Sequence, residues 1–144
     1  MLLGNYSTKI SSGHRVAVPN NFRKEVGTTF VIAKWYEKCL VLVSSERWNE
    51  LLKRITGETQ FVTQSVRDTD RFILGSAFEL STDAQGRVVL PASLVQFAGF
   101  QDEVVFIGLG DRVEIWDKTE WDKRETYISE HATELLEQIA KNDK

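Results

Sequence analysis

Short apolar runs alternate with polar or glycine-containing turns over most of the chain, a pattern typical of short β-strands. The runs hold three or four residues and are rich in valine and isoleucine, whose branched side chains favour a pleated backbone. We therefore expect strands at residues 16–18, 30–33, 40–43, 88–90, 104–107 and 113–116.

Two short amphipathic segments between these runs are each preceded by a proline and followed by a glycine. Proline suits the first turn of a helix, because its fixed φ is helical and its missing N–H is not needed there. Glycine is the usual residue after the last turn. These signals predict helices at Asn20–Val26, between Pro19 and Gly27, and at Ala92–Ala98, between Pro91 and Gly99.

Longer polar segments with apolar residues at helical spacing lie between and after the strand-rich parts. We expect one helix from a cap at Ser45 to about Ile55, and another from Gln64 to Leu74. The acidic tail from Thr119 onward predicts one or two surface helices.

The two halves of the chain repeat one another. Ser11–Pro19 matches Asp83–Pro91, because in both segments an arginine is followed by three apolar residues and a proline. The later strands align when Val31-Ile32 is matched with Val104-Val105. This predicts a first repeat at residues 1–52, a helical connector at 53–75, a second repeat at 76–122 and a helical tail at 123–144.

The composition is that of a soluble globular protein, with 42% hydrophobic and 27% charged residues among 144. No apolar stretch approaches the roughly 18 residues of a membrane span and no targeting segment is present, so we expect a cytoplasmic protein without membrane contact. The net charge of −3 is unevenly distributed: residues 4–27 carry four cations against one carboxylate, whereas residues 117–144 carry five against eight. The basic N-terminal part permits a nucleic-acid partner despite the negative total.

The sequence contains no motif of an enzyme or a metal site. The single Cys39 excludes an intrachain disulfide and a multi-cysteine zinc site, and we expect it in the core. His14 and His131 are far apart and lack the context of metal ligands. We therefore expect no catalysis, no cofactor, no metal and no small-molecule substrate.

The duplicated turn carries a D-x-x-x-R motif, which is intact as Asp83–Arg87 in the second repeat. With Ser76–Glu79 before it, Glu114–Trp116 after it and the opening Met1–Gly4, the chain resembles the MraZ family over residues 1–125. The order, duplication and spacing of these short motifs carry the resemblance.

The resemblance implies an α+β fold that is mainly a β barrel. The barrel would be of the AbrB-like swapped-hairpin or double-psi type, closed jointly by the two tandem repeats, with helices between and after them. It also implies a homo-oligomeric ring on short G-rich direct repeats in double-stranded DNA, upstream of the division and cell-wall gene cluster that includes its own gene. We therefore expect a nucleoid-associated transcriptional regulator, acting as a repressor without a cofactor.

The first repeat is the expected DNA-binding one, because Ser11 stands where the second repeat has Asp83. A serine cannot form an ion pair with the motif arginine, so Arg15 is free for a phosphate or a base. Asp83 and Arg87 are expected to pair with each other and play a structural role. The predicted DNA-binding residues are Arg15, Lys9, His14, Arg23 and Lys24.

The first repeat departs from the family pattern a second time at Gly13-His14, where lysine and glycine are usual. Histidine tolerates positive φ better than most residues, so we expect the turn to persist. Because of these departures a second interpretation stays open: an oligomeric scaffold or antitoxin-like module whose acidic C-terminal helices bind a protein partner.

Overall fold

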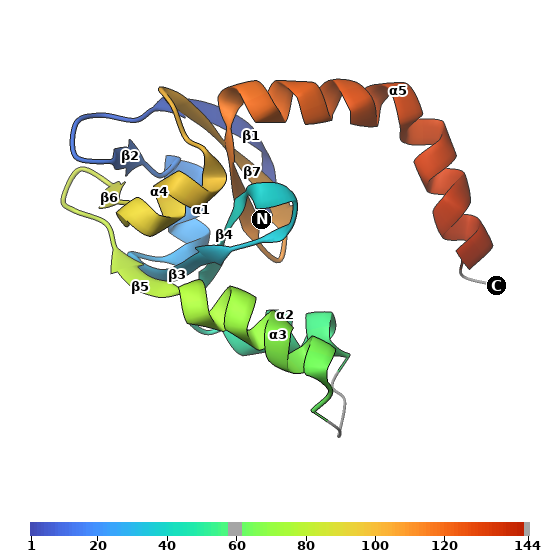
Figure 1. The fold of residues 1–144 in the computed structure, drawn as a ribbon. Helices are drawn as coiled ribbons and strands as arrows, with labels where there is room; N and C mark the ends of the chain where they lie inside the picture. Colours follow the sequence, from blue (N-terminus) through green and yellow to red (C-terminus); the bar gives the residue numbers. More distant parts are fainter. Residues whose placement is uncertain (58–61, 143–144) are drawn as a thin grey trace.

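Both halves of the chain form the same series of elements in the computed structural model, which describes residues 1–57 and 62–142 (Figure 1). The first unit contains β1 (Leu2–Lys9), β2 (Arg15–Ala17), α1 (Asn20–Val26), β3 (Thr29–Lys34), β4 (Leu40–Ser44) and α2 (Trp48–Thr56). The second unit contains β5 (Phe78–Ser81), β6 (Arg87–Val89), α4 (Ala92–Ala98), β7 (Glu103–Gly110), β8 (Val113–Asp117) and α5 (Lys118–Asn142). The remaining elements are the connecting α3 (Gln64–Ile73) with the 3-10 turn η2 (Leu74–Ser76), and the 3-10 turn η1 (Tyr36–Lys38) between β3 and β4.

The two helices predicted from the proline and glycine signals are confirmed at the predicted residues. In α1, Phe22 and Val26 are buried one turn apart, which places one face of the helix on the core. Gly27 ends the helix with a φ of 85°, a conformation that other residues adopt only at a cost.

The two units exchange their first strands. Strand β1 runs antiparallel to β7 of the second unit, from Leu2 opposite Gly110 to Lys9 opposite Glu103. Strand β5 pairs in return with β3 of the first unit. The resulting six-stranded sheet has the order β1-β7-β8-β4-β3-β5. Each edge strand and its neighbour therefore belong to different units.

Two further strand pairs lie on the approximate twofold axis that relates the units. In the β2–β6 ribbon, Val16 faces its own repeat equivalent, Val88. In the main sheet β4 pairs with its equivalent β8, with Val41 opposite Glu114. The duplicated sequence therefore folds as a dimer-like pair within one chain.

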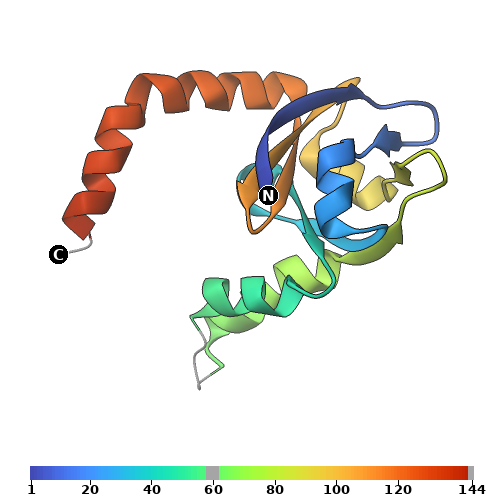
Figure 2. The same ribbon diagram turned by 180° about the vertical axis from the view of Figure 1, so that it is seen from behind.

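The expected closure into a barrel is wrong. The strands form an open sheet whose edges are β1 and β5, while β2 and β6 form a separate two-stranded ribbon. These two strands are short because Pro19 and Pro91, which cannot donate to a ladder, follow them closely. Helices α1 and α4 with the β2–β6 ribbon cover one face of the sheet, and α2, α3 and the start of α5 cover the other (Figures 1 and 2).

The predicted alignment of the third strands is wrong by one residue. Phe30 and Val104 both face the core under α1 and α4, whereas Val31 and Val105 both face the opposite core. Val31 is therefore equivalent to Val105, and the second unit has a longer connection from α4 to β7. The error matters because successive side chains of a strand point to opposite faces.

One helix prediction is corrected in detail, and the tail forms one of the one or two helices expected there. Helix α2 begins at Trp48 with Arg47 as its N-terminal boundary residue, so Ser45 is not the cap. The C-terminal tail forms one helix, α5, which projects from the body and changes direction along its length (Figure 1). No helix in residues 1–57 and 62–142 combines the length and the apolar character needed to cross a membrane.

Cys39 is a core residue, as predicted, with 1% of its surface exposed. Its thiol donates a hydrogen bond to the carbonyl oxygen of Tyr36 at 3.2 Å. Burial, with smaller contributions from the charges of Glu114 and Glu37, raises the pKa of the thiol well above its ordinary value. Because the thiolate is the reactive form, we expect alkylation of the native protein at pH 8 to be far slower than after unfolding in guanidinium. Equal labelling rates in the two states, measured by mass spectrometry, would contradict this burial.

Candidate nucleic-acid interface

Two loops, each joining the first two strands of its unit, lie side by side at one end of the molecule (Figures 1 and 2). The first loop comprises residues 10–14 and the second residues 82–86. The Val18 N–H donates to the Gly86 carbonyl oxygen at 3.0 Å, and the Leu90 N–H donates to that of His14 at 2.9 Å. Each loop is therefore held by the chain of the other unit, and the two form one continuous surface.

The β2–β6 ribbon next to these loops turns one face to the core and the other to solvent. Val16 and Val88 are each 1% exposed, whereas Arg15 and the residue opposite it, Val89, lie on the outer face. Because side chains alternate along a strand, Arg87 shares that outer face with Arg15. A two-stranded ribbon has the dimensions to enter the major groove of DNA, so this outer face is suited to meet base edges.

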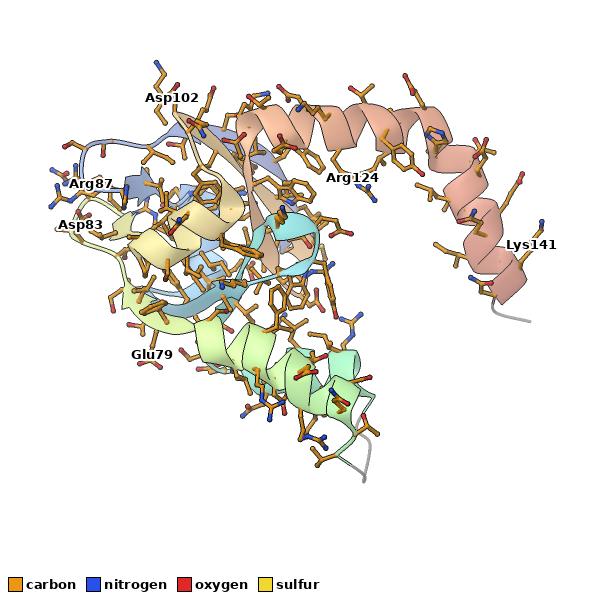
Figure 3. All side chains as sticks on the ribbon, in the orientation of Figure 1. Glu79, Asp83, Arg87, Asp102, Arg124 and Lys141 are labelled. Atoms are coloured by element: carbon orange, nitrogen blue, oxygen red, sulfur yellow. The ribbon has the colours of Figure 1, made fainter. Side chains whose placement is uncertain are left out.

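The second loop is braced by its own carboxylate (Figure 3). Asp83 Oδ1 accepts hydrogen bonds from the backbone N–H groups of Gln85 and Arg87, each at 2.9 Å. Asp83 Oδ2 accepts from Arg87 Nε at 3.1 Å, so the predicted ion pair is present. The backbone hydrogen bond from Arg87 is the main cause that lowers the pKa of Asp83, and the other bonds and the arginine charge add to it.

The first loop lacks this brace. The Ser11 hydroxyl donates to the backbone carbonyl oxygen of Arg15 at 3.2 Å and leaves the guanidinium group free. Within residues 1–57 and 62–142, no ion pair involves Arg15. The predicted persistence of the turn is confirmed, because His14 adopts a φ of 59° where the second loop has Gly86 at 78°. The turn persists with a different backbone, because Gly13 also takes a positive φ, of 80°, where Gln85 does not.

The other predicted cations surround this surface unequally. Lys9 ends β1 and is exposed, and Lys24 is exposed on the last turn of α1. His14 is exposed at the tip of the first loop. Arg23 is different: it is half-buried, and its guanidinium group lies directly over Gly86 of the second loop. The structure therefore places Arg15, His14 and Arg23 at the two loops. Lys9 and Lys24 lie on the adjoining β1 and α1.

Sequence reasoning missed the contacts between the units. Nothing in the spacing of the residues predicts that Val18 bonds to Gly86, because both partners are backbone groups. The position of Arg23 over Gly86 had one signal in the sequence. The second loop has a glycine, which has no side chain, where the first loop has His14. The described residues also contain no group of three or more His, Cys, Asp or Glu side chains placed to hold a metal ion.

Comparison with known proteins gives the family. The family model described as "MraZ protein, putative antitoxin-like" matches residues 1–72 and again residues 73–143, one match to each unit. The chain belongs to the MraZ family. It is 37% identical to the Transcriptional regulator MraZ of Syntrophomonas wolfei subsp. wolfei over 142 residues, which cover 99% of this chain and 96% of that relative. It is 32% identical to the protein of the same name from Acetivibrio thermocellus, with 97% of each chain covered.

A solved structure, "The solution structure of PHS018 from pyrococcus horikoshii", resembles this chain only distantly. The sequence identity is 16% and the TM-score 0.32, with 80% of this chain and 88% of that chain covered. Within the MraZ chain itself, the boundary between the two family matches falls near the end of α3.

The Asp83 brace predicts a pH dependence for the MraZ fold. A carboxylate whose pKa is lowered by folding stabilises the protein at pH values above its ordinary pKa of 3.8. This contribution is lost as the pH falls through the lowered pKa. Asp83→Asn is therefore expected to lower the melting temperature at pH 7 and to have a smaller effect near pH 2. Thermal unfolding followed by circular dichroism at the two pH values measures the difference, and an equal effect at both would rule out the carboxylate charge as its origin.

Proposed function

We propose that this MraZ chain is a transcriptional regulator that binds double-stranded DNA through its two loops and the β2–β6 ribbon. Relatives that match almost the whole chain carry the name Transcriptional regulator MraZ. Arg15 is proposed to contact bases or phosphate, with His14, Lys9 and Lys24 beside it, and Arg23 belongs to the same surface. Ser11, Asp83 and Arg87 are proposed to shape the loops. The four-part division 1–52, 53–75, 76–122 and 123–144 is kept as part of this proposal.

The observation that carries the proposal is the position of Arg15, which lies on the outer face of the ribbon and takes part in no ion pair within the described residues. It follows a loop that lacks the carboxylate found in the second loop, so its charge is not offset locally. An exposed guanidinium group can donate two hydrogen bonds to O6 and N7 of guanine, or neutralise a phosphate. The G-rich targets implied by the family resemblance match the first of these modes.

One chain offers a small surface, so we propose that several chains act together. A homo-oligomeric ring would present identical loops to successive direct repeats, and the second contact would then form at high effective concentration. The targets would lie upstream of the division and cell-wall gene cluster, including the gene of the protein itself, with repression as the result. The proposed protein needs no cofactor, metal or small-molecule substrate and works in the cytoplasm on the nucleoid.

A binding titration tests the proposal. Fluorescence anisotropy of a labelled duplex from the region preceding the protein's own gene is compared with a duplex of the same composition whose repeats are scrambled. We expect tighter binding to the native duplex, and an affinity that falls as salt rises from 50 to 200 mM, because each neutralised phosphate adds about −0.9 to the logarithmic salt slope. Equal affinity for both duplexes would overturn sequence-specific recognition.

A second candidate is an oligomeric scaffold or antitoxin-like module that binds a protein through α5. This helix has no fully buried residue, and Leu136 and Ile139 near its end are 69% and 59% exposed. The candidate would take precedence if the DNA titration showed no binding that depends on the repeats or on salt.

A further inference from the structure

Arg23 of the first unit is packed against the backbone of the second loop. A Cβ atom at position 86 would overlap Nη1 and Cζ of Arg23 and would lie 2.9 Å from its Nε, so the flat guanidinium group occupies the space that only a glycine leaves open. Arg23 Nη2 donates to Asn20 Oδ1 at 3.3 Å. Arg23 Nε is buried and makes no hydrogen bond within the described parts of the chain. This side chain is therefore half-buried against the second loop and not a fully solvated surface cation.

The contact adjoins the β2–β6 ribbon, which carries Arg15 and Arg87. Gly86 precedes Arg87 directly, and its carbonyl oxygen accepts the hydrogen bond from Val18, which follows Arg15 by three residues. A side chain that presses on Gly86 therefore acts on the relative position of the two strands that carry Arg15 and Arg87.

The repeat makes this contact specific to one loop. The residue of the second unit that corresponds to Arg23 is Val95, and the residue of the first loop that corresponds to Gly86 is His14. Valine has no planar cation to lay over a backbone, and histidine has a side chain where Gly86 has none. Arginine and glycine thus occur together at one junction, and valine and histidine at the other.

We propose that Arg23 is a positioning residue: by covering Gly86 it fixes the spacing and orientation of Arg15 and Arg87, and so sets the DNA sequence preference of this MraZ protein. The proposal rests on DNA binding as the function. It assigns Arg23 a different role from a phosphate contact, and the two roles predict different results.

The test compares wild type with Arg23→Lys and Arg23→Ala in the anisotropy titration, using the native and scrambled duplexes over a range of salt concentrations. Lysine keeps the charge but cannot lay a flat guanidinium group over Gly86. We expect both variants to lose about tenfold of the preference for the native duplex, the size of losing one well-placed base contact, while the salt slope stays that of wild type.

A phosphate contact would give the opposite pattern. Arg23→Lys would then resemble wild type, and Arg23→Ala would weaken both duplexes alike and reduce the salt slope by about 0.9. That result would overturn the positioning role and leave the proposed function intact. If wild type itself does not distinguish the two duplexes, the proposed function fails and with it this inference.

A double-mutant cycle makes the test independent of folding defects. Gly86→Ala introduces a Cβ at a φ of 78° and into the space of Arg23, so it is strained in any background. With Arg23 already replaced by alanine, the overlap is gone and only the backbone strain remains. We expect Gly86→Ala to reduce sequence preference in wild type and to cause little further reduction in the Arg23→Ala background, with melting temperatures recorded for all four proteins. Additive losses of preference would contradict a direct action of Arg23 through Gly86.

Discussion

Replacing Gly108 with alanine is expected to destabilise the protein by about 3 kcal/mol and to lower its melting temperature by about 10 °C. The new Cβ would lie 2.6 Å from the carbonyl carbon of Leu2 and 2.6 Å from the backbone nitrogen of Leu3. These are backbone atoms of β1, the strand of the first unit that pairs with β7 of the second. Backbone atoms cannot rotate away as a side chain can. To admit the methyl group, β1 must shift away from β7, which weakens the hydrogen bonds around Gly108. Thermal unfolding followed by circular dichroism measures the loss.

Gly75→Ala is the matched control. An added Cβ at this position meets no atom of the described residues within 4 Å, and its backbone lies outside the positive-φ region. We expect a change within about 0.5 kcal/mol of wild type, as for most surface substitutions. If Gly108→Ala were as stable as Gly75→Ala, the register that places Gly4 opposite Gly108 would be incorrect.

The local elements were predictable because their signals are local. Pro19 and Gly27 bound α1 in both the prediction and the structure, since the restricted φ of one and the free φ of the other act within a single turn. The same holds for α4. The repeat was also visible, and both units contribute residues to the core under α1 and α4.

The pairing of strands between the units could not be derived from the residues alone. The exchange of β1 and β5 depends on contacts far apart in the chain, and the sequences of these strands are compatible with pairing inside one unit as well. The alignment of Val31 failed for a related reason: a one-residue difference in a connection leaves the composition of a strand unchanged but reverses its faces. Open and closed sheets likewise contain the same short strands, so the barrel followed from family resemblance and not from the pattern.

In the candidate site, too, local features were predictable and contacts between the units were not. The loss of an acidic partner for Arg15 could be read from Ser11, because an ion pair needs a carboxylate. The contact of Arg23 had only the glycine at position 86 as a signal, because the contact itself depends on the second loop lying beside α1. Charge counting treated Lys24 and Arg23 as equals, whereas the structure exposes the first and half-buries the second.

Arg15→Ala is expected to weaken binding to the native duplex by at least about tenfold, since a bidentate contact to guanine contributes roughly 1–3 kcal/mol of discrimination. The loss grows with the number of chains that contact one DNA, because each subunit of an oligomer loses the same contact. The substitution removes an exposed side chain without an ion pair in the described residues, so the melting temperature should remain within about 2 °C of wild type. Anisotropy titrations of folded protein give the affinity directly.

Arg87→Ala and Arg124→Ala are the control variants for Arg15→Ala. The charge of Arg87 is already offset by Asp83 at 3.1 Å, so we expect its removal to lower DNA affinity by less than about fivefold while destabilising the second loop. Arg124 lies on α5, away from Asp83 and Arg87 (Figure 3), and its replacement should leave the affinity unchanged. Equal losses for Arg15→Ala and Arg87→Ala would mean that both units read DNA alike, and the missing carboxylate of the first loop would have no functional consequence. A large loss for Arg124→Ala would place the interface on α5, because that arginine shares no element with the loops.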